Sequence, residues 1–174
     1  MQLVERRIIK SNHSAFAQIN EMAFASKNLY NTANYNVRQA LFYGGHKAIP
    51  SYETLYHLMK ATQEYKALPA KVAQQVLRLL FNNWKSFKAA LVEHEQEPSK
   101  FTGVPKPPKY LEKDGRYCLI FTEQATSKKQ LRLGLIKLSE IDYCFETGII
   151  LGSVNQYCQS RIVPKLDHYV LEIV

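Results

Sequence analysis

The sequence has few cysteines, and their arrangement excludes several classes of protein. The 174 residues include only Cys118, Cys144 and Cys158, which are odd in number and widely spaced. They provide neither a disulfide framework nor a C-x-x-C pair for zinc. This cysteine usage favours a reducing, cytoplasmic compartment.

The chain also lacks long apolar runs and recognisable catalytic motifs. Its apolar runs are too short to span a membrane, and the charged start MQLVERRIIK does not predict an export signal. It has no H-E-x-x-H, P-loop, G-x-S-x-G or G-x-G-x-x-G motif, and its five histidines are scattered. We therefore expect no catalytic residue, metal or cofactor in this chain.

Positive charge is concentrated in the first part of the chain. Residues 1–110 contain 15 Lys+Arg and 7 Asp+Glu, a net charge of +8, whereas residues 111–174 contain 8 of each. A localised excess indicates an anion-binding surface, for which nucleic acid is the first candidate. The alternative is a basic protein without such a partner.

One segment, 68–87, predicts a helix with two different faces. No Asp or Glu occurs between Glu64 and Glu93, whereas an ordinary surface helix mixes both signs of charge. The basic and amide side chains repeat at helical spacing, and the apolar stripe lies nearly opposite them. The polar stripe is Lys71, Gln75, Arg78, Asn82 and Lys85, and the apolar stripe is Ala73, Leu77, Leu80, Trp84, Phe87 and Leu91.

Hydrophobic periodicity and end signals predict a strand followed by three helices. The strand is 2–10, and Ser11, Asn12 or Ser14 caps a long helix that stops at Gly44-Gly45. The second helix runs from the cap Ser51 to about Lys66. The third has Pro69 in its first turn and ends at Pro98.

The second part of the chain has strand-like alternation. A proline-rich linker, 98–110, is followed by a turn at Asp114-Gly115. Strands are expected around 117–122, 131–135 and 149–151, with a final hairpin formed by 154–163 and 168–174.

These elements predict an α+β fold, because the first strand can pair only with the later ones. We expect a small antiparallel β-barrel formed by residues 1–12 and 111–174. A three-helix bundle with its linker, residues 13–110, is inserted into it.

Two sets of polar residues allow two interpretations each. Asn28, Asn31, Tyr35 and Arg38 share a face of the first helix, which is either a nucleic-acid contact or a hydrogen-bonded seam between helices. Tyrosines such as Tyr52, Tyr56, Tyr65 and Tyr110 lie among basic positions, where they either stack on bases or pack.

The chain resembles the N-terminal part of the transposon-encoded TnpB/OrfB transposases, RNA-guided DNA nucleases related to type V CRISPR effectors. The resemblance covers essentially the whole chain in order. Its motifs are LYNTANYNVRQALF, LPAKVAQQVLRLLFNNWKSFKA, PKPPKY, GRYCLIFTEQA, LGLIKL and RIVPKLDHYVLEIV. It implies a wedge-type β-barrel with an inserted helical recognition domain.

The resemblance also implies partners and contact residues. The partners are guide RNA and a short transposon-adjacent DNA motif. Residues matching the DNA-motif contacts are Tyr52, Tyr56, Lys71, Val72, Gln75, Thr122 and Glu123. Arg38, Arg78, Lys85, Lys88, Lys106 and Lys109 are expected to contact nucleic-acid backbones.

In that family a RuvC-like nuclease domain would begin where this sequence stops, at Val174. We therefore expect that this chain alone does not cut DNA. Its protein partner would be either a nuclease domain supplied in trans or a second copy of the chain in a homodimer. The alternative function is a folded remnant or protein-interaction domain without specific affinity for nucleic acid.

Overall fold

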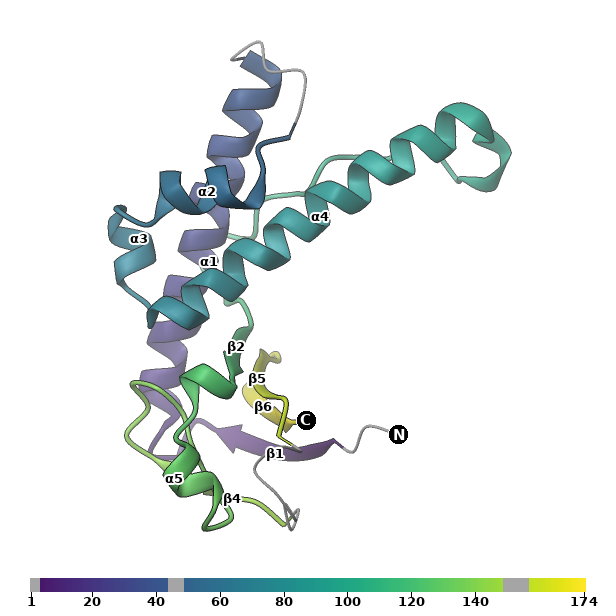
Figure 1. The fold of residues 1–174 in the computed structure, drawn as a ribbon. Helices are drawn as coiled ribbons and strands as arrows, with labels where there is room; N and C mark the ends of the chain where they lie inside the picture. Colours follow the sequence, from purple (N-terminus) through teal and green to yellow (C-terminus); the bar gives the residue numbers. More distant parts are fainter. Residues whose placement is uncertain (1–3, 44–48, 149–156) are drawn as a thin grey trace.

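A computed structural model describes residues 4–43, 49–148 and 157–174, and it has a mixed α+β fold (Figure 1). Two long helices, α1 and α4, cross each other, and the end of α4 projects away from the other elements. The helices are α1 (Phe16–Arg38), with a π-helical turn η1 (Gln39–Tyr43), α2 (Tyr52–Met59), α3 (Gln63–Lys66), α4 (Ala70–Gln96) and α5 (Lys128–Leu131). Short 3₁₀ turns are η2 (Pro98–Lys100) and η3 (Glu123–Ala125). None of the described helices is long and apolar enough to cross a membrane.

The strands form a small antiparallel sheet and a separate hairpin. The sheet has the order β1-β6-β5-β2, and β3 pairs only with β4. The strands are β1 (Glu5–Lys10), β2 (Leu119–Thr122), β3 (Leu135–Lys137), β4 (Cys144–Glu146), β5 (Gln159–Pro164) and β6 (His168–Ile173). The pairing of β1 with β6, from Glu5 opposite Ile173 to Lys10 opposite His168, confirms that the first strand is completed by a later one.

Helices and strands share one hydrophobic core. The inward-facing Ile9 of β1, Leu77 of α4 and Leu119 of β2 are each no more than 1% exposed and belong to the same cluster. Because α4 packs against both α1 and β2, a single core spans the expected inserted bundle and the strands. The division into two domains therefore stays a prediction, as does closure of the strands into a barrel.

The expected second helix is in fact two helices. The Ser51 hydroxyl caps α2 as predicted, accepting a hydrogen bond from the Thr54 N–H at 3.1 Å. The chain then turns, and Thr62 caps α3 by accepting from the Tyr65 N–H. A capping hydroxyl competes with continuous helix, which explains the break. The first helix also begins later than expected, at Phe16, and Pro69 lies just before α4.

The strand expected at 131–135 is wrong. The Ser127 hydroxyl accepts from the Gln130 N–H and starts α5, which ends at Leu131. Gly134 has a φ of +73°, and only then does β3 begin. The Ser127 cap favours a helical turn over the strand that the alternating leucines indicate. Leu133, which follows this turn, is 67% exposed. The expected apolar run 149–151 and the start of the final hairpin lie outside the described residues.

Several tyrosines with raised pKa values are expected to lower the free energy of unfolding at alkaline pH. Burial raises the pKa of Tyr30, Tyr65, Tyr117, Tyr157 and Tyr169 above the usual value. Above about pH 10 the unfolded chain loses these protons while the folded chain keeps them, so stability falls as pH rises. Burial lowers the pKa of Lys27, so this one group makes stability rise with pH. Its effect opposes that of the five tyrosines.

We expect urea unfolding at about pH 11 to require less denaturant than at about pH 8. Tyr157→Phe serves as the control because it removes one of the raised groups, so the loss of stability between the two pH values should be smaller. Equal stability at both values would contradict the prediction.

Candidate nucleic-acid interface

The two faces of α4 lie as the sequence predicts. Leu77, Leu80 and Trp84 are fully buried, whereas Lys71 and Lys85 are exposed. Arg78 and Asn82 are exposed on the same polar face, and Gln75 is half-buried there. Within the described residues, the side chains of Lys71, Gln75, Asn82 and Lys85 make no hydrogen bond or ion pair. We define these five residues, Lys71, Gln75, Arg78, Asn82 and Lys85, as the basic face.

Helix α2 supports the basic face through its tyrosines. The Tyr52 hydroxyl donates to the Gln74 carbonyl at 3.3 Å, and its ring lies edge-on to Phe81. The Arg78 guanidinium lies 4.8 Å from the centre of the Tyr52 ring. Tyr56 similarly packs on Tyr65. Both predicted tyrosines are therefore half-buried packing residues, and Tyr52 also positions a cation of the basic face.

The other predicted DNA-motif positions differ in accessibility. Val72 is 0% exposed, so the expectation that it contacts DNA is corrected: its side chain belongs to the core. Thr122 ends β2, and its carbonyl accepts from the Thr126 hydroxyl. Glu123 is exposed and forms an ion pair with Lys128, which offsets its charge. The turn η3 that begins at Glu123 packs near α4.

Part of the polar stripe of α1, Asn31 and Arg38, forms a hydrogen-bonded seam with the linker, whereas Tyr35 is 53% exposed. The Asn31 amide donates to the Leu111 carbonyl at 2.9 Å and accepts from the Leu111 N–H at 2.8 Å. Asn34 donates to the carbonyls of Pro108 and Lys109. These hydrogen bonds hold the backbone of the linker along α1.

Arg38 belongs to this seam, and its expected contact with a nucleic-acid backbone stays a prediction. It donates to the Pro108 carbonyl at 2.6 Å, and its guanidinium lies 5.1 Å from the centre of the Tyr110 ring. At the other end of the seam, the buried Lys27 ammonium donates to the Lys113 carbonyl at 2.6 Å. The sequence analysis missed Lys27 and Asn34, although their spacing from Asn31 and Arg38 is helical.

The remaining predicted backbone contacts lie beyond the basic face. Lys88 is exposed further along α4, while Lys106 and Lys109 are exposed on the linker. The linker runs beside α4, and an open groove separates the two elements. Lys106 and Lys109 line this groove from the linker, whereas its α4 side is formed by the uncharged residues Asn83, Ser86, Phe87 and Ala90.

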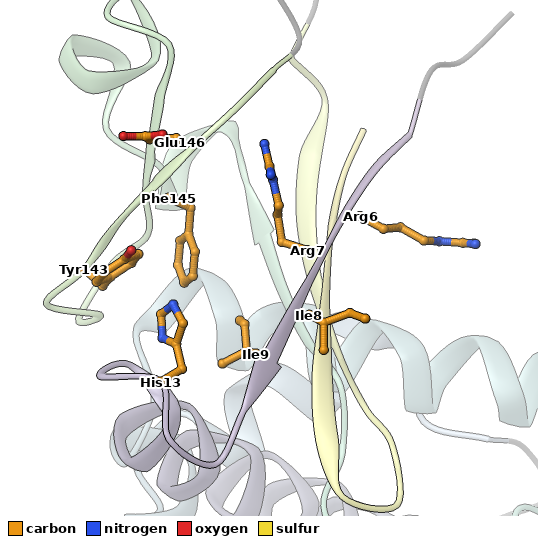
Figure 2. A pocket seen from close by; sticks show the side chains of 8 residues that line it. All are labelled: Arg6, Arg7, Ile8, Ile9, His13, Tyr143, Phe145 and Glu146. Atoms are coloured by element: carbon orange, nitrogen blue, oxygen red, sulfur yellow. The ribbon is translucent and has the colours of Figure 1, made fainter.

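A second hollow lies between β1 and β4, with a volume of about 600 Å³. Figure 2 shows Phe145 and His13 pointing toward each other there, with Ile9 beside them. Ile8 extends from the opposite side of β1, away from these rings. The His13 and Phe145 rings stack with their centres 5.8 Å apart, and His13 Nδ1 accepts from the Ala15 N–H. These residues pack, and they form no arrangement of nucleophile and base.

Metal-ligating side chains do not gather in the part of the chain that the structure describes. It holds no group of three or more His, Cys, Asp or Glu side chains close enough to share an ion. Burial raises the pKa of the Cys118 thiol above its usual value.

Comparison with known proteins adds no family assignment. No protein-family model matches the chain, and no similar sequence was found among curated proteins. The resemblance to TnpB/OrfB transposases therefore enters only as a hypothesis.

Proposed function

We propose that this protein is a nucleic-acid-binding module. The observation that carries the proposal is the basic face of α4, which is exposed, free of acidic residues and, within the described chain, largely without protein partners. Unpaired cations retained on one helix face are the electrostatic footprint of a phosphate-binding surface.

The chemistry of the basic face suggests two roles. Lys71, Arg78 and Lys85 neutralise phosphates and release counterions, which supplies affinity without sequence preference. The amides of Gln75 and Asn82 can each pair a donor and an acceptor with an adenine edge, which supplies specificity. Tyr52 holds Arg78 in place by contact with its guanidinium.

We further propose that the chain is the recognition part of a TnpB/OrfB-type RNA-guided nuclease, acting in the cytoplasm. Its ligands would be guide RNA and a short DNA motif, and cleavage would require a nuclease domain from another chain. A homodimer is the alternative protein partner. In this proposal the strands close into a wedge-type barrel. Contacts joining β1 to the end of β4 support closure: the Glu5 carboxylate accepts from the Gly148 N–H at 2.9 Å and from the Thr147 hydroxyl at 2.7 Å.

Motif reading by Lys71 and Gln75 is the sharpest test of specificity. The double variant Lys71→Ala/Gln75→Ala should lose about 1 to 3 kcal/mol of discrimination between preferred and scrambled duplexes. The preferred duplex is first selected from a random library with the wild-type chain. Competition binding then measures the ratio of affinities. An unchanged ratio in the double variant would remove these residues from the readout.

The matched control is Lys88→Ala/Gln96→Ala, which removes the same side-chain types further along α4. It should retain the preference. If the wild-type chain binds neither DNA nor RNA in a gel shift at physiological salt, the alternative of a folded remnant or protein-interaction domain is favoured.

A further inference from the structure

The groove between α4 and the linker has walls suited to a nucleobase. Its volume is about 520 Å³, within the range of ligand sites. The Phe87 side chain lines the α4 side, and Pro105, Pro108 and Tyr110 line the linker side. These groups offer flat apolar and aromatic surfaces, which bind the face of a base regardless of its identity.

Polar groups in the same groove match the other parts of a nucleotide. Asn83 and Ser86 provide an amide and a hydroxyl from α4. One N–H of the Asn83 amide donates to the Tyr30 hydroxyl at 3.1 Å, and its second N–H and its oxygen can bond a base edge. Lys106 and Lys109 provide ammonium groups from the linker for phosphate. None of the described residues that line the groove is acidic. Apolar walls, a few neutral hydrogen-bonding groups and cations at the rim are complementary to an unpaired nucleotide.

The linker wall is held in place before any ligand binds. Asn31, Asn34 and Arg38 together hold the backbone from Pro108 to Leu111 against α1. The Arg38 guanidinium also lies over the Tyr110 ring, which remains 48% exposed. A fixed aromatic surface loses little entropy on binding, so stacking there contributes more to affinity.

We propose that this groove binds an unpaired nucleotide of a single-stranded nucleic acid. The base stacks on Tyr110 and Phe87, and its phosphates lie near Lys106 and Lys109. The proposal rests on the proposed function but concerns a site separate from the basic face. A duplex keeps its base faces covered by neighbouring bases, so the groove discriminates against it.

Fluorescence anisotropy with the full chain tests this inference. The probes are labelled single strands of about 12 nucleotides, as DNA and as RNA, and a DNA duplex of the same length. Tyr110→Ala should weaken single-strand binding about 5- to 100-fold and leave duplex binding within about twofold, while Tyr110→Trp should retain affinity. If Tyr110→Ala weakens binding of the RNA strand alone, the site is assigned to RNA. If it weakens binding of both single strands, the site is assigned to single-stranded DNA and RNA alike.

A second variant separates binding from stability, because Tyr110→Ala also removes packing around Arg38. Ser86→Glu adds a carboxylate to the groove at an exposed helix position and should weaken single-strand binding. Gln96→Glu is the matched control, since it adds the same charge to α4 outside the groove, and it should have little effect.

The outcomes distinguish this inference from the proposed function. Wild-type affinity for single strands in both Tyr110→Ala and Ser86→Glu would overturn the inference and leave the basic face untouched. An equal loss for duplex and single strand would also overturn it. Absence of any nucleic-acid binding by the wild-type chain would overturn both proposals.

Discussion

Replacement of Trp84 with alanine is expected to lower the free energy of unfolding by about 3 to 5 kcal/mol. Trp84 is 0% exposed and packs edge-on against Phe87, with ring centres 5.7 Å apart. Its indole N–H donates to the side-chain amide oxygen Oδ1 of Asn34 at 2.9 Å, and Asn34 is itself fully buried. The variant therefore leaves both a cavity and an unsatisfied amide oxygen at the point where α1, α4 and the linker meet.

Such a loss is a large part of the roughly 5 to 15 kcal/mol that stabilises a domain. Urea unfolding followed by far-UV circular dichroism measures it, because Trp84 is the single tryptophan and its fluorescence is lost in the variant. Trp84→Phe keeps most of the volume and should cost less. Leu133→Ala, at a 67% exposed position, should change stability by no more than about 0.5 kcal/mol. A cost below about 1 kcal/mol for Trp84→Ala would show that this junction does not stabilise the fold as described.

Reversal of charge on the basic face is expected to abolish most nucleic-acid binding. The triple variant Lys71→Glu/Arg78→Glu/Lys85→Glu removes the three proposed phosphate contacts and adds repulsion, so affinity should fall about 100-fold or more at moderate salt. The slope of log K against log salt should become less negative by about three units. Glutamate is as good a helix former as lysine, so α4 should persist in the variant.

A control with the same change in net charge isolates the effect of position. Lys113, Lys129 and Lys165 are exposed in the second part of the chain, where the charges balance. Their triple replacement by glutamate should weaken binding far less and keep most of the salt slope. If both triple variants lose affinity equally, total charge governs binding and the basic face has no special role.

Local patterns predicted the elements whose residues act within a single helix or strand. The alternation of polar and apolar stripes on α4 follows from helical spacing alone, so its exposed cations and the buried Trp84 were predictable. The α+β class was also predictable, because an isolated first strand requires partners and only the C-terminal strands provide them. The β1–β6 pairing confirms this argument.

Predictions failed or were incomplete where packing against another segment or a local capping hydroxyl decides the outcome. Arg38 was expected to contact nucleic acid, and its spacing did not indicate that its guanidinium donates to the linker carbonyl of Pro108. Val72 matches a DNA-motif position, but it is buried beneath the basic face. The break between α2 and α3 and the helix α5 depend on capping hydroxyls, whose strength relative to continued periodicity is not evident from the pattern.

The sequence by itself determined the two-faced helix, the location of the excess charge and the need for a sheet that joins the two ends of the chain. These properties depend on spacing along one segment and on composition. Only the tertiary structure showed that Asn31 and Arg38 of α1 hold the linker and that an open groove lies between the linker and α4. Both features depend on contacts between residues roughly 70 to 80 positions apart, such as Asn31 with Leu111 and Arg38 with Pro108. Packing between residues so far apart leaves no periodic signal in the sequence.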